Sequence, residues 1–280
     1  NTHSDYKIAE GDRVTNTRYN ETDFKTGIGY SNSKFSSIFR YNYNDLDLGI
    51  PENGIAEQST NKKTEFPKQG VFNHLLNLNN IFFFEKSKLN FDLGYISNMH
   101  QTNTNSGEEY LIPDATTNDF GVFGTGIYEW NSNAIQAGLR FDNRNISTTA
   151  HGISGDEGSF DALDKSFDSF NASLGYKTNL NKNLSLRLNA ASGFRAPNLA
   201  ELTSNGVHEG TNRYEIGNPD LKTEQNVQTD LNLEYKNSHL EFFVNGFYNH
   251  INNYIYTSPT GTIIDNNAVF ECIQNDAKLF

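Results

Sequence analysis

The residues best suited to bind a ligand lie in one glycine-rich loop, Asn205-Gly206-Val207-His208-Glu209-Gly210-Thr211. Its imidazole and neighbouring carboxylate are a pair that suits Zn²⁺ and related transition metals. A second polar loop carries His151 and Asp156, which would add ligands if the two loops converge. We therefore predict that His208, Glu209, His151 and Asp156 bind a ligand, with His208 and Glu209 as metal ligands. Because a single imidazole carries little weight, the alternative of a solvated loop histidine stays open.

Charged residues and turn formers flank this loop on both sides. We expect Arg195, Glu201, Glu215 and Glu224 to form ion pairs, with direct ligand contact as the alternative role. Pro197 lacks a backbone donor and biases the residue before it to an extended conformation, so a strand over 183–195 should end there. The sequence Gly217-Asn218-Pro219-Asp220 is turn chemistry that leads into a strand over 225–236.

The sequence contains no arrangement typical of catalysis. Ser154-Gly155 lacks the strand-to-helix context of a nucleophile elbow. The acidic pair Asp156-Glu157 has no partner at the spacing of a glycosidase. Gly124-Thr125-Gly126 falls inside a strand pattern, where a phosphate cradle is not expected. We predict that the protein is not an enzyme and holds no resident cofactor.

The composition excludes several classes of protein. The chain has 280 residues and a formal net charge of −12, which argues against nucleic acid as a partner. No apolar run approaches the roughly 18 residues of a transmembrane helix. The single cysteine, Cys272, rules out a disulfide framework, and 21 Phe with 14 Tyr are too many aromatic residues for a disordered chain. A hydrophobic content of 35% fits a β-barrel, in which apolar residues occupy alternate positions.

The elements that must position these residues are long strands. Apolar and polar residues alternate over 35–43, 89–95, 135–141, 170–180, 184–190 and 227–235. A period of two places each apolar set on one face of an extended strand. No helical pattern of comparable length competes with it.

The connections between the strands alternate in length. Short turns at 31–33, 86–87, 131–132, 181–182 and 237–238 separate longer polar connections at 46–74, 99–118, 144–167, 195–225 and 257–267. This order is typical of an up-and-down outer-membrane barrel, with short periplasmic turns and long extracellular loops. We predict about eleven antiparallel transmembrane strands, with aromatic residues near their ends as interfacial girdles. A soluble β-sandwich is disfavoured because its strands are usually about 5–6 residues long.

The last 90 or so residues carry a more specific series of motifs. Gly193-Phe194-Arg195-Ala196-Pro197-Asn198-Leu199-Ala200-Glu201-Leu202 precedes Arg213-Tyr214-Glu215-Ile216-Gly217-Asn218-Pro219-Asp220-Leu221-Lys222-Thr223-Glu224. Phe247 to Tyr256 and Asn275-Asp276-Ala277 follow. This series resembles the C-terminal barrel region of TonB-dependent outer-membrane receptors. The His-containing loop between the first two motifs is similar to the zinc and metal-chelate branch of that family.

The resemblance implies an all-β fold, a bacterial outer-membrane location and a function. It implies a 22-stranded barrel closed by a plug, so residues 1–280 would be a partial barrel domain without the plug and the terminal strands. It also implies active uptake of a metal ion or metal chelate, such as a siderophore, haem or zinc. Partners would be outer-membrane lipid, a small-molecule or metal ligand, and the TonB complex acting through the plug. The motif residues would serve the architecture: Arg195, Pro197, Glu201, Tyr214, Glu215, Asn218, Pro219 and Glu224.

Two other functions remain open at the level of sequence. A passive porin or adhesin barrel shares the strand pattern but should lack the motif series that begins at Arg195. A secreted all-β carbohydrate-binding protein would use the many Asn, Tyr and Phe residues to stack on sugars.

Overall fold

The structure is a computed structural model of the chain. It describes residues 1–8, 12–51, 55–56, 62–65, 68–84, 89–106, 110–156, 158–208, 211 and 213–279.

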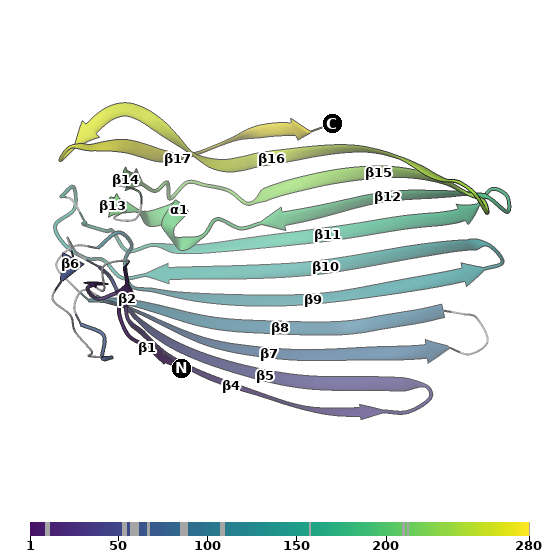
Figure 1. Cartoon of the computed structure of the whole chain (residues 1–280), viewed down its shortest axis with the longest axis horizontal. Coiled ribbons are helices and arrows are strands. Elements are labelled where there is room, and N and C mark those ends of the chain that lie inside the picture. Colours follow the sequence, from purple (N-terminus) through teal and green to yellow (C-terminus); the bar gives the residue numbers. More distant parts are fainter. Residues whose placement is uncertain are drawn as a thin grey trace.

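Eleven long strands lie side by side in chain order and form one antiparallel sheet (Figure 1). They confirm the predicted all-β fold and its strand number. Over the residues described, the sheet is not closed into a barrel: its first long strand pairs with its second and with a two-residue strand, β1 (Thr2–His3). The long strands are β4 (Tyr19–Ser31), β5 (Phe35–Gly49), β7 (Lys68–Phe84), β8 (Leu89–Ser106), β9 (Ala115–Trp130), β10 (Asn133–Thr148), β11 (Asp164–Asn179), β12 (Leu184–Arg195), β15 (Glu224–Lys236), β16 (Glu241–Ile264) and β17 (Asn267–Leu279).

Short turns join the strands at one end of the sheet, and longer segments join most of them at the other (Figure 1). Asparagine side chains close two of these turns. The Oδ1 atom of Asn32 accepts hydrogen bonds from the backbone N–H groups of Lys34 and Phe35, both 2.8 Å long. Asn237 does the same for His239 and Leu240. We call the two ends of the sheet the turn end and the loop end.

The predicted long connection at 257–267 is wrong. Strand β16 continues to Ile264 and β17 begins at Asn267, so a two-residue turn replaces a loop. Asp265 and Asn266 both have positive φ angles, 44° and 64°, which is the conformation of a tight hairpin turn matched to strand twist. The hairpin therefore extends to the loop end instead of opening into a loop.

The strands separate side chains onto two faces. On one face, Leu139 of β10 lies opposite Ala172 of β11, and Leu174 of β11 lies opposite Ala190 of β12. Leu139 and Leu174 remain more than half exposed, at 57% and 58%. We call this the apolar face. On β10 it runs from Ile135 to Phe141, about 20 Å at roughly 3.4 Å per residue, close to the ~25 Å apolar band of an outer-membrane barrel.

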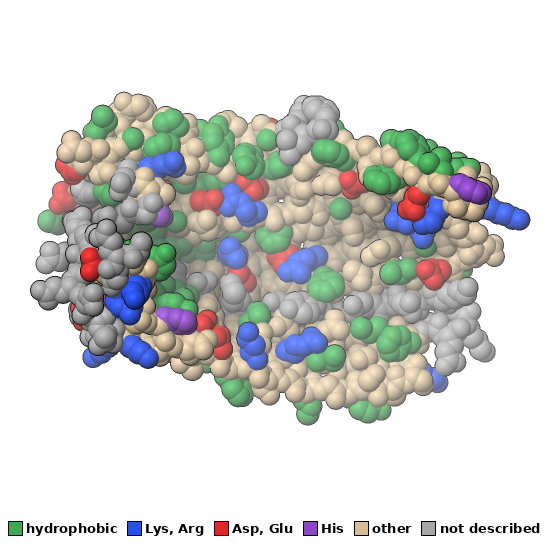
Figure 2. All heavy atoms as spheres, in the orientation of Figure 1, with side chains coloured by type: hydrophobic (Ala, Val, Ile, Leu, Met, Phe, Trp, Pro, Cys, Tyr) green, Lys and Arg blue, Asp and Glu red, His purple; other side chains and the backbone are tan. Residues whose placement is uncertain are grey.

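The other face, the polar face, carries ion pairs between neighbouring strands and within them. Arg144 of β10 pairs with Asp119 of β9 at 2.6 Å, and Arg187 of β12 pairs with Glu234 of β15 at 3.6 Å. Blue and red side chains lie next to one another in the middle of the molecule (Figure 2). These ion pairs compensate charges locally on this wall. No helix among the described residues is long and apolar enough to cross a membrane.

The buried core is small and lies at the loop end. It contains Leu202 and Leu221 from the segment between β12 and β15, together with strand residues such as Ile146 and Phe167. We call this segment, residues 196–223, the insert. It holds the helix α1 (Leu199–Thr203) and two short strands, β13 (Asn205–His208) and β14 (Arg213–Ile216). A separate small sheet contains β2 (Tyr6–Lys7), β3 (Arg13–Val14) and β6 (Ile55–Ala56).

Candidate functional site

The insert begins where the sequence predicts the end of a strand. Strand β12 ends at Arg195, and Pro197 is fully buried directly after it. Asn198 then caps α1: its Oδ1 atom accepts from the Glu201 backbone N–H at 2.8 Å, and the Glu201 carboxylate accepts from the Asn198 backbone N–H at 2.9 Å. This reciprocal capping box starts a helix of only five residues.

Arg195 joins the helix to two strands. Its Nη1 atom donates to the carboxylate of Glu201 at 2.7 Å, and its Nε and Nη2 atoms donate to Glu224 at 2.7 and 2.8 Å. Glu224 in turn accepts from the backbone N–H of Ile255 on β16 at 2.6 Å. We call Arg195, Glu201 and Glu224 the Arg195 cluster. It connects the end of β12, α1, the start of β15 and β16.

The expected fourth member, Glu215, does not join this cluster. It lies on β14 opposite Phe270 of β17, and it makes no ion pair within the part of the chain that the structure describes. The reason is geometric, because β14 leaves the cluster to pair with β17. The ion-pair prediction is therefore wrong for Glu215.

The environment of the Arg195 cluster lowers the affinity of the Glu224 carboxylate for protons. Burial alone would raise the pKa of Glu224, but hydrogen bonds from Arg195 and Ile255 and the charge of Arg195 hold it below its usual 4.5. The hydrogen bond to Glu224 raises the pKa of Arg195 further above neutrality. Burial raises the pKa of the nearby Cys272 thiol to about 11. At neutral pH Arg195 and Glu224 are thus charged and the Cys272 thiol is protonated.

The turn after β14 packs directly on the end of α1. A Cβ atom at Gly217 would lie 2.4 Å from the backbone nitrogen of Thr203, so only glycine fits this contact. The backbone N–H groups of Gly217 and Asn218 donate to Ser204 and Glu201 carbonyls at 2.7 and 2.8 Å. Asn218 also accepts from the Asp220 backbone N–H at 2.9 Å around Pro219, which is exposed.

Strands β13 and β14 form a hairpin that reaches across to β17. Strand β14 pairs with β17 in parallel, with Tyr214 opposite Val269. Tyr214 is buried, and the Arg213 guanidinium lies 4.5 Å from the centre of the Phe270 ring. The insert thus bridges strands that are not its neighbours in sequence.

His208 ends β13, opposite Arg213 in the hairpin. It is half-buried, and its Nδ1 atom is buried without a hydrogen-bond partner among the described residues. A buried polar atom of this kind calls for a partner such as water or an ion. Glu209 lies outside the described residues. The described residues contain no group of three or more His, Cys, Asp or Glu side chains arranged to hold a metal.

The loop that carries His151 and Asp156 does converge with the insert. The Asp156 carbonyl accepts a hydrogen bond from the Asn205 side chain at 3.1 Å. His151 is exposed, and its ring stacks on Tyr110 with centroids 4.2 Å apart. The structure therefore brings the two predicted ligand loops together at the loop end.

Three residues of this region were not predicted from the sequence. Asn198 has a readable signal, since an Asn three residues before Glu201 is a capping pattern. Tyr110 and Asn205 have no local signal, because their partners lie in other loops. Long-range contacts of this kind appear only in the folded chain.

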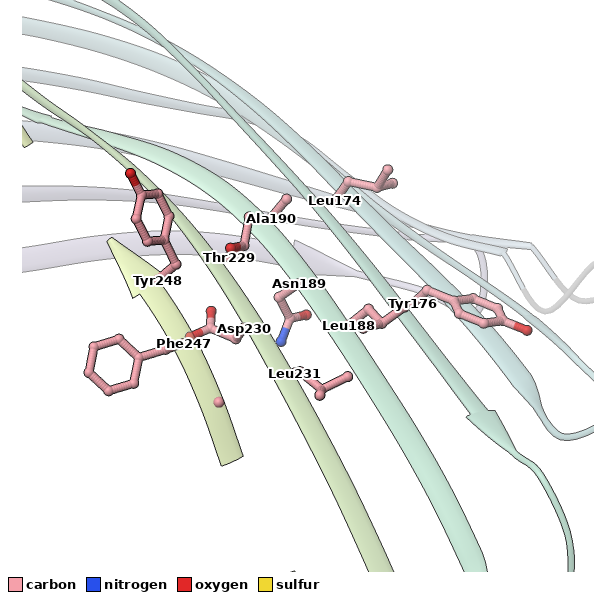
Figure 3. Close-up of a pocket in the computed structure, with 11 residues that line it drawn as sticks. Leu174, Tyr176, Leu188, Asn189, Ala190, Thr229, Asp230, Leu231, Phe247 and Tyr248 are labelled. Atoms are coloured by element: carbon pink, nitrogen blue, oxygen red, sulfur yellow. The ribbon is translucent and has the colours of Figure 1, made fainter. Parts of the chain in front are cut away.

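A separate depression of about 570 Å³ lies along β11, β12, β15 and β16 (Figure 3). Its apolar side chains include Leu174, Leu188 and Leu231, which belong to the apolar face. It is part of that face and away from the loop-end site.

The comparisons with known proteins agree on the architecture. The family model "TonB dependent receptor-like, beta-barrel" matches residues 1–278. No curated protein matches the sequence.

Solved structures of similar fold have low sequence identity. A copper transporter, OprC, is 14% identical with a TM-score of 0.66, over 94% of this chain and 42% of that one. The hemophore receptor HasR of Serratia marcescens is 11% identical with a TM-score of 0.60, over 98% and 49%. The siderophore receptor PirA of Pseudomonas aeruginosa is 12% identical with a TM-score of 0.55, over 95% and 53%. The chain spans about half the length of these structures, and the likeness shows the fold.

Proposed function

Because the chain belongs to the family of TonB-dependent receptor-like β-barrels, we propose that it forms part of a receptor that takes up a metal ion or metal chelate. The barrel is an outer-membrane domain and not an enzyme. Energy from the TonB complex, acting through a plug, is part of the proposal. The cargo class rests on solved structures of similar fold that are named as a siderophore receptor, a copper transporter and a hemophore receptor.

The meeting of two loops at the loop end is the observation that carries this proposal. Asn205 binds the Asp156 carbonyl, so strand β13, which ends at His208, lies against the loop that contains His151. Imidazole and carboxylate groups bind transition metals, and an imidazole also coordinates the metal of a chelate with an open position. The unpartnered Nδ1 atom of His208 supports its role as a ligand.

The polar face supports a path for the captured ligand. Ion pairs such as Arg144 with Asp119 leave polar groups along the wall while compensating their charge. A polar chelate then meets hydrogen-bonding groups along the wall, and no single group binds it tightly. In this proposal the loops capture the ligand, the plug closes the pore, and TonB opens it.

The experiment compares binding to the full-length receptor and to two histidine variants. The probes are Zn²⁺, a ferric siderophore and haem, each titrated against purified receptor in detergent. We expect His208→Ala to weaken binding of at least one probe by about tenfold or more, as loss of a group that supports a metal does. His239→Ala is the matched control, since His239 is exposed at the turn end.

Equal affinity of the wild type and His208→Ala for every probe that binds would remove His208 from the site. A loss caused equally by His239→Ala would point to a general effect on the barrel. Wild-type receptor that binds none of the probes would contradict the proposed cargo class.

A further inference from the structure

We infer that Asn205 is a positioning residue that joins three loop-end segments into one unit and thereby sets the places of His151 and His208. The segments are residues 110–114, residues 149–163 and the β13–β14 hairpin. The evidence that Asn205 links the three segments is its own contacts, whereas the consequence for ligand capture rests on the proposed function.

The side-chain amide of Asn205 makes three hydrogen bonds, with both of its donors and its acceptor oxygen in use. Its Nδ2 atom donates to the carbonyls of Asp156 at 3.1 Å and Ser159 at 2.9 Å. Its Oδ1 atom accepts from the Tyr214 hydroxyl at 2.9 Å. Two donors and one acceptor on a short stem are a requirement that aspartate cannot meet, because a carboxylate only accepts.

The backbone of Asn205 makes two further contacts between segments. Its N–H donates to the Leu111 carbonyl at 3.2 Å, and its carbonyl accepts from the Gly158 N–H at 2.8 Å. Every polar group of this residue is thus bonded to another part of the chain. The partners lie in all three segments.

His151 contacts Phe160 and Tyr110, and each of these two residues is adjacent in sequence to a residue that Asn205 binds. Ser159 precedes Phe160, whose backbone exchanges hydrogen bonds of 2.8 and 2.9 Å with the backbone of His151. Leu111 follows Tyr110, on whose ring His151 stacks. Asn205 is also only three residues from His208 on the same short strand. Asn205 therefore sets the position of the His151 imidazole relative to that of His208.

The close packing around Asn205 supports a fixed arrangement. A Cβ atom at Gly206 would lie 3.0 Å from the Tyr110 carbonyl oxygen, so the hairpin and segment 110–114 are in tight backbone contact. Gly158 has a positive φ angle of 67°, which fits the tight turn that presents its N–H to Asn205. Loops ordered before binding lose less conformational entropy when a ligand arrives.

The test uses hydrogen exchange on the full-length receptor, with Asn205→Asp, Asn205→Ala and the control Tyr214→Phe. Tyr214→Phe removes one hydrogen bond to Asn205 and leaves the other contacts. We expect both Asn205 variants to speed exchange at least tenfold in residues 110–114 and 149–163 together. The control should change these rates by less, and exchange at the turn end, residues 237–240, should not change.

A second readout separates positioning from a loss of overall structure. For each of Zn²⁺, haem and a ferric siderophore that the wild type binds, Asn205→Asp should weaken binding with an unchanged melting temperature of the barrel. Faster exchange in only one segment, or in neither, would overturn the inference. Faster exchange in both segments with unchanged binding would refute the effect on the histidines. If none of the three probes binds the wild type, the proposed function is refuted. The exchange rates still decide whether Asn205 links the three segments.

Discussion

The N-terminal segment, residues 1–18, and the insert are attached to the long strands in different ways. Both fold against the loop end, and each is held by an arginine beside a long strand. Arg18 directly precedes β4 and is almost fully buried with Asp5, each side chain 1% exposed. Arg195 ends β12 and is 41% exposed, although its partner Glu224 is only 10% exposed. The Arg18 side chain is inaccessible to water, whereas the Arg195 side chain is partly accessible.

The partners of the two arginines also differ. Arg18 donates through Nε and Nη2 to both carboxylate oxygens of Asp5, at 2.9 and 2.8 Å. Its Nη1 atom donates to the Lys63 carbonyl at 3.2 Å and, more weakly, to the exposed Glu65 carboxylate at 3.4 Å. Arg195 divides its short hydrogen bonds between two carboxylates, Glu201 and Glu224. A buried pair leaves an uncompensated charge when one partner is removed, whereas solvent moderates the loss at an exposed one. The comparison teaches that the N-terminal segment should open all at once and that the insert should respond gradually to salt and pH.

The largest expected effect is that of Arg18→Met. This change leaves the Asp5 carboxylate buried without its partner, and the expected loss is about 3–5 kcal/mol in the free energy of opening the N-terminal segment. Hydrogen exchange of residues 1–8 and 62–65 in the full-length receptor measures it. The double variant with Asp5→Asn should recover part of the loss, and a failure to recover any would contradict the ion-pair explanation.

Gly217→Ala should come next. The added methyl group meets backbone atoms of α1, and such overpacking typically costs about 1–3 kcal/mol. The same exchange experiment on residues 196–208 measures it. Gly246→Ala is the matched control because a Cβ atom there meets nothing within 4 Å. If the two alanine variants behave alike, the close contact at Gly217 does not hold the insert.

Arg195→Met should have a smaller effect than Arg18→Met. Solvent partly replaces the lost partner of Glu201 and Glu224, and we expect a loss of about 1–2 kcal/mol in the stability of the insert. The control is Arg187→Met, because the more exposed pair of Arg187 with Glu234 should contribute less than about 1 kcal/mol. A loss at Arg195 equal to that at Arg18 would show that exposure does not distinguish the two clusters.

The smallest expected effect is a dependence on pH confined to the insert. Glu224 has a lowered pKa in the folded chain, so its contribution is fully present above its usual 4.5. It is lost as the pH falls below 4.5 through the lowered value. Opening free energies of the insert, corrected for intrinsic exchange rates, should fall over this range in the wild type and less in Glu224→Gln. An equal fall in both would assign the pH dependence to other groups.

The strands and turns were predictable because their signals are local. Alternation such as that of Leu184, Leu186 and Leu188 specifies a strand within a few residues. Asn32 and Asn237 form turns from their own side chains. The hairpin at Asp265 and Asn266 was missed because the polar and turn-forming residues at 257–262 suggested a loop. Pairing of residues 257–259 and 263–264 with β17 instead continues the strand past an irregularity at 260–262.

The two arginine regions differ in how far sequence could reveal them. Arg195 stands in a motif, and its partners Glu201 and Glu224 are in the same stretch of chain. Arg18 has no motif, and its partners come from two separate segments, Asp5 from one and Lys63 and Glu65 from the other. The same reason hides Asn205, whose contacts depend on three loops. Sequence therefore predicts the scaffold and the candidate ligands, and the fold alone shows what positions them.

Uptake by cells that produce the full-length receptor tests the central claim most directly. The measurement is accumulation of a labelled ferric siderophore, haem or Zn²⁺, with the TonB complex present or absent. An active receptor for metal cargo predicts that at least one of these accumulates only when TonB is present and the cells are energised. Accumulation that is the same without TonB, or none for all three, would contradict the account.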